Sequence, residues 1–479
     1  MESLKERAAK GLIWGTFTSG ATQLLNVVIG IFLARLLSPA DIGLVGMITI
    51  FTVLASNLQE SGFFTALVNK KDASHDDYNS VFWFCLSLSI VIYIVLFFSA
   101  PLIASFFHQP ELLWLSRFVF LSFIISAVGI AHSAWMFSRL MVRQRAVIMV
   151  VSLIVSGTVG IVLAMRGYSY WSLAWQQVIF NLVFNIGRLS VTRWHPTFSF
   201  TFRPIREMFR FSNKILIPTV INTISQYFLS VVFGRFYPAH TVGYFTQAFK
   251  WNTMGYQFVG DGVAQIAQPV MVEVREEKER SRRVLLTMLR YTAFMSFPAL
   301  FGLAMCSEEF IVQLLTAKWQ PAVPILQVLC IGGAFMPFYK IYQNFIISHG
   351  RSDIYMWLNI CQIIVQFAVV IFTRQWGIMP MVAAYTVVNI LWLGLWQQQA
   401  KRLSAVGWIS VARTIVPFLI VAMLSMVATW LITQSLGNLT LRLIARIAVG
   451  AGIYIALLKL FRFSIIDECW QFVSKRKRA

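Results

Sequence analysis

Long apolar segments alternate with short polar connections along the whole chain. Window hydropathy indicates about fourteen such segments, each long enough to cross a hydrocarbon core of about 30 Å as a helix. Because the core contains no water to satisfy backbone hydrogen bonds, these segments should be helical. The expected spans are 11–34, 42–66, 79–100, 113–136, 147–165, 169–190, 212–234, 242–268, 286–306, 324–348, 353–373, 377–398, 410–433 and 440–461.

One stretch between two apolar segments occurs twice, 200 residues apart. The first copy reads Arg35-Leu-Leu-Ser-Pro-Ala-Asp-Ile-Gly and the second reads Arg235-Phe-Tyr-Pro-Ala-His-Thr-Val-Gly. Proline interrupts a helix, so each copy predicts a helical hairpin with a tight turn. The corresponding pairs are Arg35 and Arg235, Gly43 and Gly243, and Gly62 and Gly262.

The repeat also predicts how the helices are organised. Six spans separate the two copies, so both hairpins should cross the membrane in the same direction. This predicts two six-helix lobes related by a pseudo-twofold axis along the membrane normal, with two extra helices at the C-terminus. The expected parts are an N-terminal lobe (1–195), a C-terminal lobe (196–402), spans 13 and 14 (403–463) and a basic tail (464–479).

Composition supports a polytopic membrane protein. The chain is 58% hydrophobic and 12% charged, whereas soluble domains carry about 25% charged residues. The net charge of +21 comes largely from alternate loops, which hold roughly thirty of the lysines and arginines and which should therefore be cytoplasmic. This arrangement places both termini in the cytoplasm and argues against nucleic acid as a partner. The five cysteines lack the spacing of a metal or disulfide framework, so neither a metal nor a cofactor is expected.

Four short sequences resemble one family of membrane proteins. They are Arg35-Leu-Leu-Ser-Pro-Ala-Asp-Ile-Gly-Leu-Val, Ser61-Gly-Phe-Phe-Thr-Ala-Leu-Val-Asn-Lys-Lys, Lys318-Trp-Gln-Pro-Ala-Val-Pro-Ile-Leu-Gln and Gly350-Arg-Ser-Asp. They resemble the polysaccharide-transporter branch of the multidrug/oligosaccharidyl-lipid/polysaccharide exporter superfamily, over nearly the whole chain.

The resemblance implies a bacterial flippase of the cytoplasmic membrane. Such proteins move undecaprenyl-pyrophosphate-linked oligosaccharide, for capsule, exopolysaccharide or O-antigen, to the outer leaflet by alternating access. The resemblance also implies contact with membrane lipids, a groove for the polyprenyl tail beside spans 13 and 14, and association with a glycan polymerase or chain-length protein. It does not identify the sugar or the driving force.

Two lysines inside predicted spans are the main candidates for contact with the anionic headgroup. Lys250 lies in span 8 and Lys340 in span 10. An ionisable side chain costs at least about 2.5–3.5 kcal/mol at the centre of a span, so each is a functional candidate. For Lys250 the alternative is that its side chain extends to the outer interface.

Three arginines lie at the predicted outer ends of spans. Arg35 and Arg235 are the repeated pair, and Arg117 lies near the start of span 4. Each can hold a headgroup near release. Alternatively, Arg35 and Arg235 anchor helix ends by binding exposed carbonyl groups.

Uncharged polar and acidic residues complete the set of candidates. Amides in spans 1 and 7 can bind sugar hydroxyl groups or join one helix to another. Two acids near the inner ends of spans 2 and 8 can bind a proton or Na⁺, or pair with a basic neighbour. The amides are Gln23, Asn26 and Gln226, and the acids are Glu60 and Asp261.

Three other functions compete with the flippase. An exporter of small organic cations coupled to H⁺ or Na⁺ would share the fold, but would need buried acids where this chain has lysines. A polymerase would be an enzyme with a large outward loop, and here the outward loops are short. No catalytic motif such as His-Glu-x-x-His or Gly-x-Ser-x-Gly occurs, so no enzyme activity is expected. A scaffold of a glycan-assembly complex stays an alternative.

Overall fold

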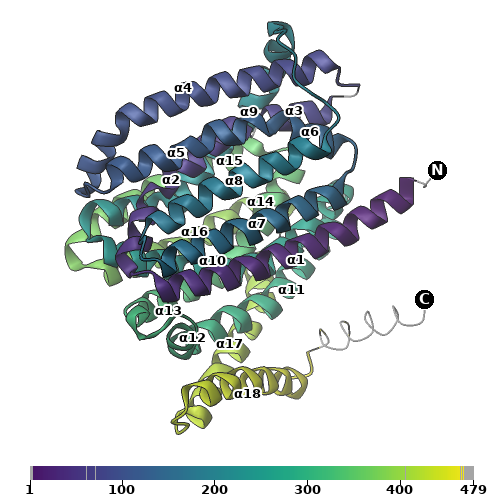
Figure 1. Ribbon diagram of the computed structural model, residues 1–479. Helices are drawn as coiled ribbons and strands as arrows, with labels where there is room; N and C mark the ends of the chain where they lie inside the picture. Colours follow the sequence, from purple (N-terminus) through teal and green to yellow (C-terminus); the bar gives the residue numbers. More distant parts are fainter. Residues whose placement is uncertain are drawn as a thin grey trace. The chain divides into compact units, whose positions relative to one another are not determined.

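The computed structural model describes residues 4–60, 62–70, 72–404, 406–463, 465 and 468. Every regular element among them is a helix, which confirms the all-helical class (Figure 1). The chain forms two compact units, residues 1–246 and 247–479. The lobe and tail boundaries expected from the repeat stay predictions.

The first unit consists of α-helices that pack side by side. Helix α1 packs on α7, α7 on α8, α8 on α5 and α5 on α4, and α9 packs on both α2 and α4 (Figure 1). The helices are α1 (Leu4–Leu36), α2 (Pro39–Glu60), α3 (Phe63–Asn69), α4 (His75–Phe107), α5 (Leu112–Val128), α6 (Ile130–Ser138), α7 (Val142–Met165), α8 (Trp171–Val191) and α9 (Phe202–Phe236).

Helix α10 (Ala239–Glu273) begins in the first unit and continues into the second. In the second unit, α11 packs against α13 and α17, α16 packs against α13 and α15, and α18 packs against α12 and α17. The elements are α11 (Lys278–Met305), α12 (Ser307–Leu315), η1 (Ala317–Trp319), α13 (Ala322–Gly333), α14 (Met336–Ser348), α15 (Ser352–Thr373), η2 (Arg374–Trp376), α16 (Ile378–Ser404), α17 (Trp408–Thr433) and α18 (Leu439–Leu460).

Each expected span coincides with a helix or with two consecutive helices. Ten spans in the described part of the chain are long and apolar enough to cross a membrane, or eleven if the bent pair α5–α6 is one span. Helices α8, α9 and α10 do not meet this criterion. One reason in α8 is a row of amides, Gln176, Gln177, Asn181 and Asn185. The chain is therefore a multi-pass membrane protein, and the count of fourteen stays a prediction.

Both repeated sequences form the expected hairpins. Helix α1 ends at Leu36 and α2 begins at Pro39, while α9 ends at Phe236 and α10 begins at Ala239. In the first turn, the Ser38 backbone N–H donates to an Asp41 carboxylate oxygen at 2.9 Å, and the Asp41 N–H donates to the Ser38 hydroxyl at 3.2 Å. These reciprocal bonds satisfy N–H groups at the start of a helix.

The two hairpins touch each other through their repeated glycines. A Cβ atom on Gly43 would lie 1.8 Å from the carbonyl oxygen of Ala239, and a Cβ on Gly243 would lie 1.8 Å from that of Pro39. Each obstructing carbonyl belongs to the first residue of the opposite helix, so the contact is reciprocal. Only glycine permits the two backbones to approach this closely.

We expect Gly43→Ala and Gly243→Ala each to destabilise the protein by about 1–3 kcal/mol, because the added methyl group would overlap a backbone oxygen. Thermal unfolding of the purified protein in detergent measures the effect. Gly20→Ala is the matched control, because a Cβ there meets open space and alanine favours the helix. Equal unfolding midpoints for the three variants would contradict the proposed role of the contact.

Candidate functional site

The two candidate lysines lie at different depths of the second unit. Lys250, on α10, is half-buried, and its Nζ atom lies 5.8 Å from the ring centroid of Trp251. Lys340, on α14, packs its Cδ atom 3.4 Å from the position that a Cβ of Gly260 would occupy. Gly260 follows Lys250 by ten residues on α10, which corresponds to about 15 Å along the axis. The lysines therefore occupy two levels along α10.

The C-terminal end of α4 accepts a bond from Arg235. One guanidinium nitrogen of Arg235 donates to the Phe106 carbonyl at 2.6 Å and lies 3.1 Å from the His108 ring nitrogens. A carbonyl at a helix end has no partner within its own helix, so this contact supports the helix-anchoring interpretation. Arg35 is exposed in the last turn of α1. Binding of a headgroup by either arginine stays a prediction.

Arg117 satisfies a carbonyl that a proline leaves without its helical partner. Pro101 lies inside α4 and has no N–H to donate to the carbonyl of Phe97. The Arg117 Nε atom donates to that carbonyl at 3.4 Å, and its guanidinium lies 4.2 Å from the Phe97 ring centroid. Arg117 thereby joins α5 to α4, and its predicted contact with substrate stays a prediction.

The amides of the first unit divide into exposed and packed groups. The candidates Gln23 and Asn26 on α1 and Gln226 on α9 are exposed. By contrast, Asn185 is buried and donates to the Ile125 carbonyl of α5 at 3.0 Å. The packed amides join helices, and the exposed candidates are available to a ligand.

The acidic candidates lie outside the described side chains. This applies to the carboxyl groups of Glu60 and Asp261, and of the basic tail only residues 465 and 468 are described. Among the described residues, no group of three or more histidine, cysteine, aspartate or glutamate side chains is arranged to hold a metal ion.

A buried ion cluster, which the sequence alone did not predict, joins α12 to α18. Glu309 is fully buried and pairs with Arg446, which is 5% exposed, at 2.6 Å. Its other carboxylate oxygen pairs with Arg442, whose guanidinium also lies 3.7 Å from Glu308. Arg446 falls inside an expected span and satisfied the criterion applied to the lysines. Its acidic partner, 137 residues away, cannot be identified from a single sequence.

Two side chains of α18 satisfy carbonyls of α11 that lack a helical partner. Pro298 lies inside α11 and has no N–H to donate to the Phe294 carbonyl. That carbonyl accepts a hydrogen bond from the Tyr454 hydroxyl at 3.0 Å. The carbonyl of Met305, the last residue of α11, accepts from Arg446 at 2.8 Å. These bonds attach α18 to α11.

An apolar groove lies beside these contacts between α11 and α18 and is here called the α18 groove. It has a volume of about 610 Å³, and Arg446 is its only charged lining residue among those described. Its remaining lining comes from α10, α11, α12, α17 and α18: Phe258, Val259, Phe294, Met295, Pro298, Ala299, Gly302, Leu303, Met305, Cys306, Phe310, Met426, Leu443, Ile447, Gly450, Ala451, Tyr454 and Ile455. Such a groove can hold a long apolar chain.

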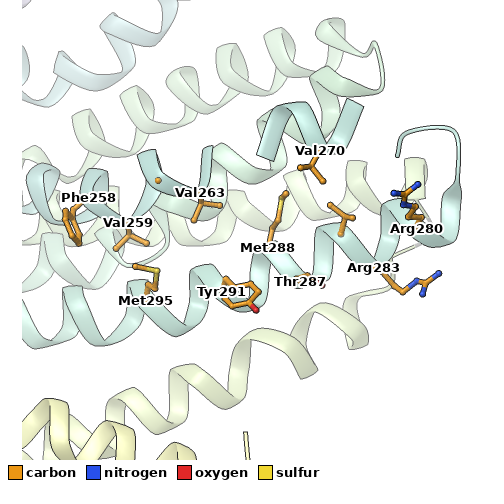
Figure 2. A pocket seen from close by; sticks show the side chains of 12 residues that line it. Phe258, Val259, Val263, Val270, Arg280, Arg283, Thr287, Met288, Tyr291 and Met295 are labelled. Atoms are coloured by element: carbon orange, nitrogen blue, oxygen red, sulfur yellow. The ribbon is translucent and has the colours of Figure 1, made fainter. Parts of the chain in front are cut away.

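A second groove, of about 710 Å³, lies between α10 and α11 and is here called the α10–α11 groove (Figure 2). It shares Phe258, Val259 and Met295 with the α18 groove. Apolar residues of the expected spans line both grooves, so nothing in their sequence distinguished them from ordinary packing residues.

Comparisons with known proteins show the family of the chain through its sequence and its fold through solved structures. The model of a family described as "Polysaccharide biosynthesis protein" matches residues 32–324. The teichuronic acid biosynthesis protein TuaB of Bacillus subtilis is 25% identical over 74% of this chain and 74% of its own. The succinoglycan biosynthesis transport protein ExoT of Rhizobium meliloti is 23% identical over 97% of this chain and 95% of its own. The structure of the lipid II flippase MurJ in an inward closed conformation superposes with a TM-score of 0.79 at 16% identity, covering 95% of this chain and 100% of that one.

We expect Glu309→Gln to destabilise the protein by about 3–5 kcal/mol, because it leaves the buried Arg446 without a counter-charge. Glu308→Gln is the matched control. Glu308 is half exposed, and its loss should cost less than about 1 kcal/mol. Thermal unfolding in detergent compares the two variants, and equal shifts would show that the cluster contributes little.

We expect Tyr454→Phe to destabilise the protein by about 1–3 kcal/mol, because it leaves the Phe294 carbonyl without a partner. The effect should shrink in a Pro298→Ala background, where residue 298 regains an N–H for that carbonyl. A double-mutant cycle by thermal unfolding tests this coupling. Equal effects of Tyr454→Phe in the two backgrounds would contradict this role of the hydroxyl.

Proposed function

Because the chain belongs to the polysaccharide biosynthesis protein family, we propose that it moves an undecaprenyl-pyrophosphate-linked oligosaccharide across the bacterial cytoplasmic membrane. The family match, the similarity to a succinoglycan transport protein over nearly the whole length and the flippase-like fold support this function. Transport would proceed by alternating access, with both termini in the cytoplasm.

The α18 groove is the observation that carries the proposal. A polyprenyl carrier has an apolar chain that must stay out of water while its headgroup crosses the bilayer. An apolar groove with one arginine suits such an amphiphile, because burial of apolar surface favours the chain by about 25 cal/mol per Å². A free sugar would gain nothing from these walls.

The headgroup would meet cations at successive levels of its path. Lys250 and Lys340, about 15 Å apart along α10, would each lower the cost of bringing pyrophosphate into the bilayer. Arg35 would meet the headgroup at the outer end of the path. Binding by Arg117 or Arg235 would compete with the α4 carbonyl groups that these side chains already hold.

The remaining assignments concern the glycan, the driving force and partner proteins. The exposed amides Gln23, Asn26 and Gln226 would exchange hydrogen bonds with sugar hydroxyl groups. Glu60 and Asp261 would bind a coupling proton or Na⁺. A glycan polymerase or chain-length protein would receive the product, and the chain itself would catalyse no reaction.

Transport in proteoliposomes tests the function and the two lysines together. With fluorescent undecaprenyl-pyrophosphate oligosaccharide, we expect wild-type protein to translocate the lipid. Lys250→Ala and Lys340→Ala should each reduce the rate about tenfold or more, because each removes a hydrogen bond to a charged group. Lys401→Ala is the control, because Lys401 is exposed in the last turn of α16.

The outcomes separate the substrate from the site. Wild-type transport with unchanged rates in both variants would leave the flippase function in place and remove the lysines from the path. Failure of the wild-type protein to move the lipid, together with exchange of an organic cation for protons, would overturn the proposed function.

A further inference from the structure

The α10–α11 groove is built from one face of each of two helices. On α10 the lining residues Phe258, Val259, Gly262, Val263 and Val270 follow helical spacing. On α11 the lining residues recur within about one helical turn of each other: Arg280, Arg283, Val284, Thr287, Met288, Tyr291 and Met295. The groove therefore runs along the helix axes. From Arg280 to Met295 it extends about 22 Å.

The groove is apolar along its length and cationic at one end. Its only charged lining residues among those described are Arg280 and Arg283, which lie together near the loop that joins α10 to α11 (Figure 2). Phe258 and Met295 lie at the opposite end. The groove thus has the polarity of an amphiphile with an anionic head.

The two arginines retain donors for a ligand. Arg283 is exposed and makes no ion pair or hydrogen bond with any residue in the described part of the chain. Arg280 lies 3.3 Å from Glu277 and 3.8 Å from Glu273, and such exposed pairs contribute at most about 1 kcal/mol. At the rim, Tyr291 donates to Glu468, and Arg290 pairs with that carboxylate, so the adjacent acid is already neutralised.

We propose that the α10–α11 groove binds one anionic phospholipid of the leaflet at which the α10–α11 loop lies, with its phosphate at Arg280 and Arg283. The charge distribution predicts that this is the cytoplasmic leaflet. One leaflet contributes about 15 Å of hydrocarbon, so a groove of about 22 Å holds a single acyl chain and reaches the headgroup region. Basic pockets between membrane helices on this side commonly bind anionic headgroups.

Two alternative occupants fit the groove less well. A soluble anion would use the arginines and leave the apolar walls exposed. A polyprenyl carrier chain is much longer than one leaflet and would need the α18 groove as well. Met288 and Met295 suit acyl chains of varied shape, because methionine side chains are flexible and polarisable.

Native mass spectrometry of the full-length protein in detergent tests the headgroup. The probes are dioleoyl-phosphatidylglycerol, dioleoyl-phosphatidylcholine and undecaprenyl phosphate, each titrated alone. We expect phosphatidylglycerol to bind more tightly than phosphatidylcholine. Arg280→Ala and Arg283→Ala should each weaken phosphatidylglycerol binding about fivefold. Arg282→Ala is the matched control, because this neighbour carries the same charge and does not line the groove.

Three results of this titration would overturn the proposal. The first is equal affinity for phosphatidylglycerol and phosphatidylcholine. The second is equal weakening of phosphatidylglycerol binding by Arg282→Ala and Arg283→Ala. The third is binding of undecaprenyl phosphate that depends on Arg280 and Arg283, with no preference for phosphatidylglycerol over phosphatidylcholine. The last result would assign the groove to the carrier instead.

A second pair of variants tests the acyl chain. A Cβ on Gly262 meets open space, so Gly262→Leu should fill the groove without disturbing the fold. We expect it to weaken phosphatidylglycerol binding, with an unchanged unfolding midpoint. Gly452→Leu, on α18, is the control, because a Cβ there also meets open space and Gly452 lines neither groove. Undiminished phosphatidylglycerol binding by Gly262→Leu would show that the acyl chain does not lie in this groove.

Discussion

Every backbone carbonyl inside a bilayer must find a hydrogen-bond donor within the protein, and prolines make this requirement acute. Pro101 and Pro298 each free a carbonyl in the middle of a long helix, Phe97 in α4 and Phe294 in α11. In both cases a side chain from a neighbouring helix supplies the donor, Arg117 in one and Tyr454 in the other. In these two helices, the carbonyl that the proline frees thus becomes a hydrogen-bonded contact with a neighbouring helix.

The same requirement changes how intramembrane charges should be interpreted. The Arg446 guanidinium donates hydrogen bonds to a helix-end carbonyl and to a buried carboxylate, so its charge already has partners within the protein. Arg117 is used in a similar way. Lys250 has only a distant contact with the Trp251 ring among its described neighbours. An ionisable residue with few structural contacts is a better candidate for a transported headgroup than one that holds two helices together.

Local signals in the sequence were sufficient for much of the fold. Pro39 and Pro238 break the chain at fixed points, so both hairpins could be placed to within a few residues. The repeat also paired Gly43 with Gly243, but it could not reveal that these glycines lie against each other, because helix contacts depend on tertiary packing. For the same reason the residues predicted neither the Glu309–Arg446 pair nor the α10–α11 groove, and the expectation of a groove beside spans 13 and 14 came only from the family resemblance. Gln23, Asn26 and Gln226 are exposed, as a residue that binds a glycan must be. Residue type alone could not establish this exposure.

Helices α17 and α18, for which the repeat predicts no counterpart, contribute residues to the apolar α18 groove. Tyr454 and Arg446 bind α18 to two carbonyls of α11, and residues of both helices line the α18 groove. Without α18 the groove would lose the lining residues that this helix contributes. Arg446 and Tyr454 also line this groove, so the same two side chains attach α18 to α11 and shape the apolar surface between them.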